Sequence, residues 1–532
     1  MSDTELLYRQ AQRAAQAGQG AEAQTVYEQL LEQVSGGRLR ALVLSDLGTL
    51  AALRGELPMA TGYFQSALET DADCRSARIN LQAIGEPETV APTSKSDGEN
   101  GEVRTRIAVL SLLFNWPSTG GGIIHTVELV RFLRKAGYDV RHLYAVFPGW
   151  DMGRVTEELP GDHRPLVFDD ASWNADGIRQ RFREALDEYR PDWVVITDSW
   201  NSKPLLAEAA RGYRYVLRLA AQELLCPLNN VRLLMDGSGR FCACPRHQLA
   251  TPDVCRACVQ TQERCSGGLH RAERALVGFG GADYDKSLRR AVAEAEAVLV
   301  VNPLIAEMVK PYAKRVEVVT SGFDVVRFPW PWPEENQQRR PSIFFAGLVD
   351  ELMKGFTVLQ AACERLWSMG WDFELVATGE PTNQHDARTR FIGWLSQEDL
   401  PSAMRRSDII VCPTLAEEAL GRTAVEAMGV GRPVVASRIG GLQFTVIDGL
   451  TGFLCPPGDD VALAETLARL LGDTELRERL GREGRKRFEE HYTWDVIIPR
   501  HYEPLFGPSK VGRALSSVIR SERKSAVPAE PM

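Results

Sequence analysis

The stretch DIIVCPTLAEEALGRTAVEAMGVGRPVVAS, residues 408–437, reads as a strand, a loop, a helix and a second strand. Its two terminal runs are rich in β-branched residues and apolar on both faces, which is typical of strands in a parallel sheet that helices cover on both sides. Between them, Glu418 lies in the loop, Gly421 follows, and Glu426 falls inside the helix. The order strand–helix–strand predicts one unit of a doubly wound α/β sheet.

Short apolar runs of the same kind recur earlier in the chain, separated by amphipathic helical stretches. They are RIAVLSLL (106–113), VRHLYAV (140–146), DWVVITDS (192–199), YRYVLRLA (213–220), AVLVVN (297–302), VEVVTSG (316–322), SIFFAG (342–347) and FELVATG (373–379). A break near residue 303 divides the runs into two sets. The pattern therefore predicts two doubly wound domains, residues 105–303 and residues 304–485.

The first 88 residues follow a helical repeat instead. Small and aromatic residues recur at a spacing of 37: Gly18, Ala23, Tyr27 and Leu30 match Gly55, Ala60, Phe64 and Ala67. This pattern resembles the tetratricopeptide repeat, whose usual period is about 34 residues, and predicts an all-α repeat domain over residues 1–88. Two unrelated amphipathic hairpins are the alternative. Two repeats leave an apolar face open, so we expect that face to bind a protein partner, a second copy or the rest of the chain.

Two segments have compositions that do not favour a packed core. The polar stretch EPETVAPTSKSDGENGEVR (86–104) predicts a flexible linker, which we place at residues 89–104. Residues 507–532 have a similar composition and predict a disordered tail.

The overall composition excludes several classes of protein. The chain has 532 residues and a formal net charge of −9, which argues against nucleic acid as a partner. The opening MSDTELLYRQ does not read as a secretory signal, and no run approaches the roughly 20 apolar residues of a membrane span. Ten cysteines without an export signal favour reduced thiols. We therefore expect a cytoplasmic protein, with loose attachment to the inner face of the membrane left open.

The two glutamates suggest a ligand with a sugar, a diphosphate and a ribose. Ligands of doubly wound sheets bind beyond the carboxyl ends of the strands, where helix N-termini present free amides. Gly421 would let an anion approach the backbone, Glu426 could accept two ribose hydroxyls, and Glu418 would face the attached sugar. A solvated pair of surface carboxylates is the alternative. A glycoside hydrolase is disfavoured because Glu426 lies within a helix behind a phosphate-binding turn.

Several further motifs occur in order along the chain. They are TGGGIIHTVELVRFLRKAGYDV (119–140), VEVVTSGFDVVRF (316–328), FFAGLVDELMKGFTVL (344–359), FIGWLSQEDLPSAMRRSDIIVCPT (391–414) and IGGLQFTVIDGLTGFLCPPGD (439–459). Together with residues 412–437 they resemble the retaining glycosyltransferases of family 4, over residues 105–505. The resemblance implies the GT-B fold, in which two Rossmann-like domains face each other across a cleft. It also implies a C-terminal helix, residues 486–506, that crosses back to the N-terminal domain.

The resemblance implies transfer of a sugar from a nucleoside-diphosphate sugar to an acceptor, with retention of configuration. The acceptor could be a glycan, a lipid-linked molecule or a protein. Lys354 and Glu418 would be the catalytic residues, with Lys354 neutralising the leaving diphosphate. The implied donor-binding residues are Glu426, Gly121, Gly122, Leu420, Gly421 and Arg422. Because helix ends and Lys354 would stabilise the leaving group, no catalytic metal is expected.

The sequence departs from the family pattern on the side of the acceptor and at the phosphate loop. Leu348 stands where the family usually has an arginine, and Phe444 stands where it has a glutamate. A histidine common before the Cys226–Pro227 position is absent, with Gln222 or Glu223 as candidate substitutes. These departures keep a second function open: a repeat-containing interaction protein that carries a catalytically degenerate glycosyltransferase module.

A cysteine-rich insertion, residues 226–265, interrupts the first doubly wound domain. It contains Cys226, Cys242, Cys244, Cys255, Cys258 and Cys265. The two-residue gap between Cys255 and Cys258 is that of a zinc knuckle, and Cys242 and Cys244 could supply further ligands. The spacing thus predicts a structural zinc site, with free thiols or labile disulfides as the alternatives.

Overall fold

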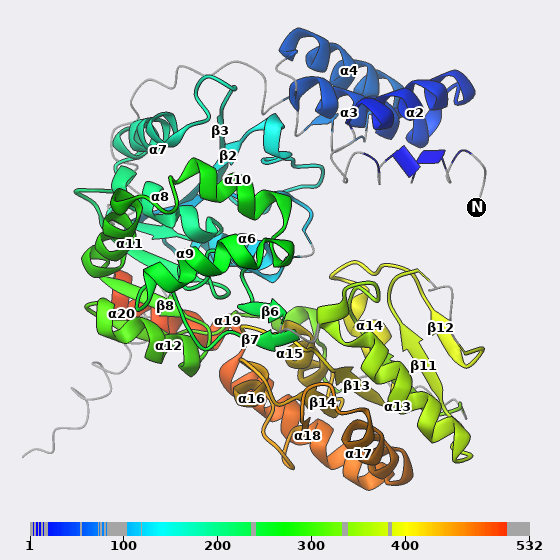
Figure 1. Cartoon of the computed structure of the whole chain (residues 1–532). Helices are drawn as coiled ribbons and strands as arrows, with labels where there is room; N and C mark the ends of the chain where they lie inside the picture. Colours follow the sequence, from blue (N-terminus) through cyan, green and yellow to red (C-terminus); the bar gives the residue numbers. More distant parts are fainter. Residues whose placement is uncertain are drawn as a thin grey trace, which may run out of the picture. The chain divides into compact units, whose positions relative to one another are not determined.

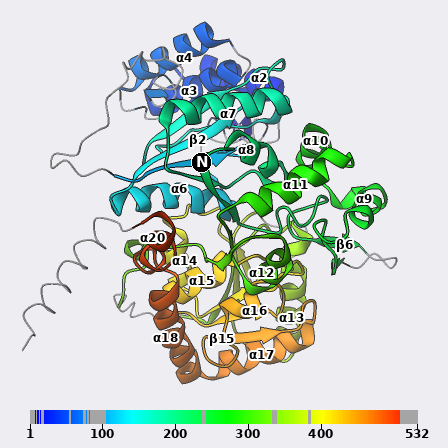
Figure 2. The ribbon, with the colours of Figure 1, turned by 90° about the vertical axis from the view of Figure 1, so that its left-hand side faces the viewer.

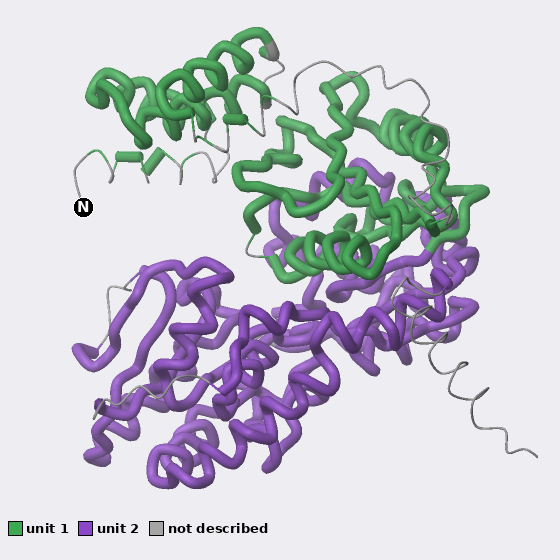
Figure 3. The backbone as a smooth tube through the Cα atoms, turned by 180° about the vertical axis from the view of Figure 1, so that it is seen from behind, with its two compact units in different colours: residues 1–215 green, residues 216–532 purple. Residues whose placement is uncertain are grey.

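A computed structural model describes residues 4, 7–8, 10–11, 14, 20–53, 56–72, 74, 77–78, 81, 104–118, 120–235, 241–331, 339–380 and 386–507 (Figure 1). The chain forms two compact units, residues 1–215 and residues 216–532 (Figure 3). The predicted linker 89–104 lies outside the described residues except for Arg104, and the predicted tail 507–532 except for Gly507.

The N-terminal part of the first unit is helical. Its helices include α2 (Gly20–Gln33), α3 (Gly37–Leu53) and α4 (Leu57–Thr70). The small and aromatic residues of the sequence pattern are buried: Ala23, Tyr27, Leu30, Ala60, Phe64 and Ala67. A side chain on Gly48 of α3 would place its Cβ 2.6 Å from the Phe64 ring, so α3 and α4 pack closely at this glycine. Gly18 and Gly55 lie outside the described residues.

The rest of the first unit contains four parallel strands in the order β3-β2-β1-β4. The strands are β1 (Arg106–Ser111), β2 (Asp139–Val146), β3 (His163–Val167) and β4 (Trp193–Ile196). The helices are α6 (Gly121–Lys135), η1 (Pro148–Trp150), α7 (Ala175–Tyr189), η2 (Trp200–Ser202) and α8 (Lys203–Ala209). β1, the central strand of these, is almost wholly buried, as its apolar sequence predicts. β5 (Arg214–Leu219) lies at the boundary of the two units.

The second unit contains a parallel sheet of six strands in the order β12-β11-β10-β13-β14-β15. Its strands are β10 (Ser342–Phe345), β11 (Glu374–Ala377), β12 (Thr389–Phe391), β13 (Ile409–Cys412), β14 (Val434–Ser437) and β15 (Gly452–Cys455). In the same unit, β5 pairs in parallel with β8 (Ala297–Val300), and β8 pairs with β9 (Val316–Val318). β6 (Leu233–Met235) and β7 (Phe241–Ala243) form an antiparallel hairpin within the cysteine-rich insertion.

Helices cover both faces of the six-stranded sheet. The helices of the second unit as a whole are α9 (Pro252–Thr261), η3 (Glu263–Cys265), α10 (Gly268–Leu276), α11 (Ala282–Glu294), α12 (Pro303–Val309), η4 (Lys310–Tyr312), η5 (Val325–Arg327), η6 (Leu352–Lys354), α13 (Phe356–Ser368), α14 (Leu400–Arg405), α15 (Arg422–Gly429), α16 (Leu442–Thr445), α17 (Asp460–Gly472), α18 (Thr474–His491), α19 (Trp494–Ile497), η7 (Ile498–Tyr502) and α20 (Glu503–Phe506). One core lies between the sheet and α13 and α17, and the other packs α14 and α15 against the opposite face. α17 and α18 also contact β15 at the edge of the sheet (Figure 2). The two cores give the doubly wound arrangement that the apolar strand runs predict.

The segment after α18 lies near β5 and β9. His501 Nδ1 is 3.9 Å from Glu317 Oε2 of β9, and the Tyr502 ring is fully buried. Upstream, the amide of Phe323 donates to the carbonyl of Tyr492 over 2.8 Å, which joins the end of α18 to the chain after β9. None of the helices in the described part of the chain combines the length and the apolar character that crossing a membrane requires.

Candidate functional site

The loop between β13 and α15, residues 413–421, lies at the carboxyl end of the six-stranded sheet. Leu415 N and Thr414 Oγ1 both donate to the carbonyl of Met353, over 2.8 and 2.9 Å. From the next strand, the amide of Gly441 donates to the carbonyl of Glu418 over 2.6 Å. The loops that follow β10, β13 and β14 therefore meet at one place, where a doubly wound sheet binds its ligands.

Two glycines let these loops approach. Gly355 has a φ of +73°, and a Cβ there would lie 2.0 Å from the carbonyl oxygen of Pro413. Gly421 has a φ of +76°, and its Cβ would lie 2.3 Å from Leu442. Each glycine directly precedes a helix, α13 or α15, so the first-turn amides of both helices begin at this loop. At both positions a side chain would clash with a neighbouring segment, and the positive φ would strain any residue other than glycine.

The two predicted catalytic residues form an ion pair. Lys354 Nζ donates to Glu418 Oε1 over 2.7 Å, with both side chains about one-third exposed. The carboxylate raises the pKa of Lys354, against the opposing effect of burial. Lys354 ends η6 and Glu418 lies in the 413–421 loop, so the contact joins residues far apart in the sequence. The structure thus places a cation and an anion side by side and accessible at the end of the sheet.

Glu426 lies inside α15, as predicted, and is buried. Arg422, one turn earlier, has its Nη2 3.8 Å from Glu426 Oε1, and its guanidinium lies over the Phe323 ring at 4.3 Å. As a predicted donor-binding residue, Arg422 would supply the positive charge that the phosphate loop lacks at Leu348. Its contacts instead turn it toward the helix carboxylate and a core aromatic ring.

Cys412, which was not predicted as a site residue, interacts electrostatically with the charged residues of this site. It ends β13, and burial raises the pKa of its thiol to about 12. Smaller contributions to this value come from Glu418 and Glu426, which raise the pKa, and from Lys354, which lowers it. All three charged groups therefore lie within electrostatic reach of one sulfur atom.

Glu417, next to Glu418 in the chain, has its own partners. Arg232 Nη1 and Gln222 Nε2 each lie 3.5 Å from Glu417 Oε2. Burial raises the pKa of Glu417, and Arg232 opposes that shift. One residue beyond Glu418, the carbonyl of Ala419 accepts a 2.7 Å hydrogen bond from Asn302 Nδ2. The segments after β5 and β8 thus hold the loop from the other side.

The remaining predicted donor-binding residues lie in different surroundings. The Leu420 side chain is buried in the core below α15, so only its backbone faces the loop. Gly121 and Gly122 are the first residues of α6 in the other compact unit. Leu348, at the position of the family's arginine, is 37% exposed. The carbonyl of Phe444, where the family has a glutamate, accepts a 2.8 Å hydrogen bond from Arg487.

The six cysteines of the insertion form no disulfide bond in this structure, and five of them take part in electrostatic interactions with one another. Cys244 raises the pKa values of Cys226, Cys255 and Cys258, in addition to the larger effect of burial, and Cys265 does so for Cys258. Within the described residues, no three His, Cys, Asp or Glu side chains are placed so that they could hold a metal ion. Zinc binding by this insertion stays a prediction.

Comparison with protein families identifies the segment that carries most of this site. Residues 328–487 match the family described as glycosyl transferases group 1. The segment includes β10 to β15 and all of Lys354, Glu418 and Glu426. It is a glycosyltransferase domain of that group.

Curated relatives match over part of their length. Glycogen synthase of Mycobacterium tuberculosis is 32% identical over 208 residues, which are 37% of this chain and 49% of that protein. Phosphatidyl-myo-inositol mannosyltransferase of Propionibacterium freudenreichii is 28% identical over 282 residues, covering 52% of this chain and 72% of that protein. The chain thus spans about half the length of the first of these relatives.

Solved structures show a similar fold at low identity. Sucrose-phosphate synthase from Thermosynechococcus elongatus superposes with a TM-score of 0.54 and 18% identity, covering 79% of this chain and 100% of that chain. The Anabaena protein Alr3699/HepE superposes with a TM-score of 0.53 and 15% identity, covering 75% and 99%. The parallel sheets of this chain therefore have the GT-B type of α/β fold.

Proposed function

We propose that this protein transfers a sugar from a nucleoside-diphosphate sugar to an acceptor, with retention of configuration. The observation that carries the proposal is the 2.7 Å pair of Lys354 and Glu418 between the N-termini of α13 and α15. Helix N-termini and a lysine favour the phosphates of a donor. The acceptor could be a glycan, a lipid-linked molecule or a protein. Peripheral attachment of a cytoplasmic protein to the membrane belongs to the same proposal.

The residues divide the work of binding and bond breaking. When a donor phosphate takes Lys354 as its partner, Glu418 is released to accept hydrogen bonds from sugar hydroxyls. Charge develops on the diphosphate as the bond from the anomeric carbon to the phosphate oxygen breaks, and Lys354 and the helix amides stabilise it there. Glu426, buried behind Gly421, would accept the ribose hydroxyls. Gly121 and Gly122 would approach the donor phosphates from the other Rossmann-like domain.

No catalytic metal is part of this proposal, because the lysine and two helix ends supply positive potential for the leaving group. The choice of UDP as the first nucleotide to test follows the Anabaena structure, which was solved in complex with UDP-glucose. Because that structure is only 16% identical to this chain, UDP serves as a first probe, and the donor nucleotide is to be identified by binding experiments.

The helical N-terminus would serve recruitment. α2, α3 and α4 bury the small and aromatic residues that the sequence pattern shares with tetratricopeptide-like repeats. We propose that these repeats bind an acceptor-bearing protein or a second copy of the chain. If the glycosyltransferase domain bound no donor, the alternative of an interaction protein with a degenerate module would replace the transfer reaction.

Titration calorimetry with a panel of nucleoside diphosphates, UDP first, tests donor binding. Glu426→Ala should raise the Kd for the nucleoside diphosphate about ten- to hundredfold, since a buried charge-assisted contact contributes about 1.5–3 kcal/mol. Glu465→Ala, which changes an exposed glutamate of α17, is the matched control and should bind as the wild type does. A wild-type protein that binds none of the panel would contradict the transfer reaction and favour the interaction protein.

A further inference from the structure

Arg232 connects the cysteine-rich insertion to the 413–421 loop. It lies just before the β6–β7 hairpin, and its side chain is only 6% exposed. Its Nη1 lies 3.5 Å from Glu417 Oε2, and its Nη2 donates to the carbonyl of Cys244. The amide of Cys244 in turn donates to the carbonyl of Arg232 over 2.8 Å. One side chain therefore contacts both the hairpin and the residue next to Glu418.

The conformation of Arg232 supports a specific role. Its φ is +50°, a left-handed region that residues other than glycine seldom adopt. Such a conformation persists where surrounding contacts hold it, and it is concentrated at functional sites. Here the contacts are the reciprocal hydrogen bonds with Cys244, the sulfur of Met308 at 2.8 Å from Nη1, and the carboxylate of Glu417.

Glu417 depends on this partner. Its side chain is 15% exposed, and besides Arg232 it has the amide of Gln222 at 3.5 Å. A buried carboxylate that loses its cation must be resolvated, neutralised or moved. Any of these changes acts on the backbone at Glu417, one peptide bond from Glu418 and its pair with Lys354.

We propose that Arg232 is a positioning residue, which holds Glu417 so that the neighbouring Glu418 is set for turnover. The cysteine-rich insertion is then part of the support of the reactive loop. This proposal rests on the sugar transfer proposed above. The contacts of Arg232 are with Glu417, Cys244 and Met308, and none of these is a predicted donor-binding residue. We therefore expect the insertion to affect turnover and not donor binding.

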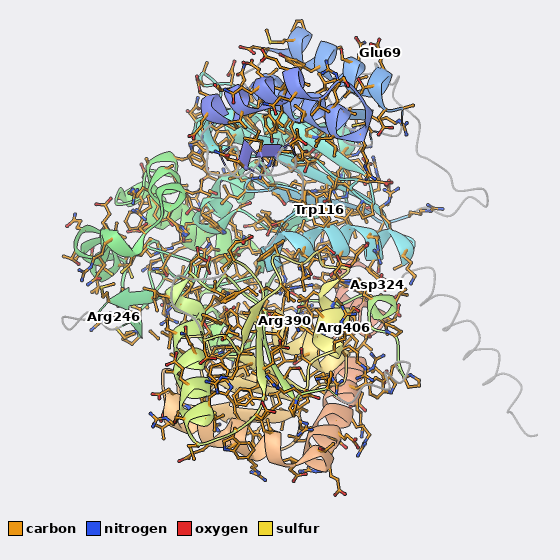
Figure 4. The ribbon with its side chains drawn as sticks, turned by 90° about the vertical axis from the view of Figure 1, so that its right-hand side faces the viewer. Glu69, Trp116, Arg246, Asp324, Arg390 and Arg406 are labelled. Carbon is orange, nitrogen blue, oxygen red and sulfur yellow. The ribbon has the colours of Figure 1, made fainter. Side chains whose placement is uncertain are left out.

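The test uses the full chain with Arg232→Met, which keeps a long side chain and removes the charge. We expect kcat to fall about ten- to hundredfold, while the Kd for UDP changes by less than about threefold. Hydrogen exchange should become faster in the peptide covering residues 414–421. Arg246→Met is the matched control, because Arg246 is an exposed arginine of the same insertion (Figure 4). It should leave kcat, Kd and exchange unchanged.

A double variant separates positioning from simple destabilisation. Arg232→Met combined with Glu417→Gln removes both charges, so it should recover part of the turnover that Arg232→Met alone loses. Wild-type kcat and exchange in Arg232→Met would overturn the proposal. A rise in exchange spread over the whole second unit, with no recovery in the double variant, would overturn it too.

The exchange measurement keeps this proposal distinct from the transfer reaction. If the wild type transfers no sugar from any donor, the transfer reaction fails, and the peptide 414–421 still reports whether Arg232 holds the loop. Faster exchange confined to that peptide supports the contact, and unchanged exchange refutes it.

Discussion

Glu418 is fixed at two of its atoms. Its carboxylate accepts from Lys354 and its carbonyl accepts from the amide of Gly441. The carbonyl contact belongs to the loop and does not depend on the charge of the side chain. Replacement of the carboxylate should therefore leave the loop in place and change only the chemistry of the site.

Glu418→Gln should lower kcat about ten- to hundredfold and change the Kd for a nucleoside diphosphate little, because the amide keeps the shape and loses the charge. Steady-state kinetics with an identified donor, together with calorimetry, measures the two effects. Glu364→Gln on the exposed face of α13 is the control. Full activity of Glu418→Gln would remove Glu418 from the catalytic residues.

Gly355 provides a test of the loop contact itself. Gly355→Ala places a Cβ 2.0 Å from a backbone oxygen at a φ of +73°, so the loops after β10 and β13 must separate. We expect a loss of about 1–3 kcal/mol in unfolding free energy and weaker UDP binding. Gly370→Ala is the matched control: its φ is +90°, yet nothing lies within 4 Å of the added Cβ. Equal losses of UDP binding in both variants would contradict a role for the Gly355 contact.

At the residue scale, the features that could be predicted from the sequence are those set by a local motif. The helix that follows Gly421 and the place of Glu426 inside it follow from spacing along a few turns. The partners of Glu417 and the hydrogen bond from Asn302 to Ala419 were missed, because they join segments more than a hundred residues apart. The positive φ of Arg232 has no sequence signal, since arginine is not a residue that favours it.

At the scale of elements, a chain of polar groups crosses the three strands β1, β2 and β3. His142 Nε2 is 2.9 Å from Ser111 Oγ, and His142 Nδ1 is 2.9 Å from His163 Nδ1. Burial lowers the pKa of both histidines, that of His163 from 6.5 to about 4. Asp162 raises the pKa of His163 and Arg134 lowers it, but both effects are smaller than that of burial.

This histidine pair makes stability sensitive to acid. Below a pH of 6.5 the unfolded chain takes up a proton at His163, whereas the folded protein does not until about pH 4. Stability is therefore complete above 6.5 and is lost as the pH falls through this window. His163→Gln should show a smaller fall in thermal midpoint between about pH 7.5 and about pH 5 than the wild type. The same fall in both proteins would contradict this reading.

Metal analysis tests the zinc site that is predicted for the cysteine-rich insertion. Protein purified without a histidine tag should contain about one zinc per chain, and Cys258→Ser should reduce that content. Cys74→Ser, which changes a buried thiol just after α4 in the N-terminal region, should not. Zinc-free wild-type protein with thiols that titrate freely in the folded state would contradict the prediction.

The sequence predicted the central strands better than the edges, although the outer strand β9 does lie in the predicted run 316–322. The apolar runs at 106–113, 342–347 and 408–414 contain β1, β10 and β13, each of which has a strand on both sides. β3, β12 and β15 were not predicted. Each is an outer strand in the order of its unit's parallel strands, and β3 and β12 include His or Arg residues. A strand at the edge of a sheet is covered on fewer sides and needs fewer apolar residues, so it lacks the apolar run from which a strand can be predicted.

At the scale of the whole molecule, the helical N-terminus and the glycosyltransferase segment can be tested separately. Deletion of residues 1–88 should leave UDP binding within about twofold of the full chain, because Lys354, Glu418 and Glu426 all lie in the second unit. The same deletion should change oligomeric state or acceptor use. Calorimetry and light scattering measure these effects, and loss of UDP binding would show that the N-terminus is needed for the donor site to fold.

The glycines after β14 have a consequence for protein engineering. A Cβ on Gly440 would lie 2.5 Å from the Glu418 carbonyl oxygen, and one on Gly441 would lie 1.9 Å from that of Ala419. The two backbones fill the space between them, so neither loop has room to change alone. A chimera that takes its 413–421 loop from another transferase must therefore take residues 438–441 from the same donor.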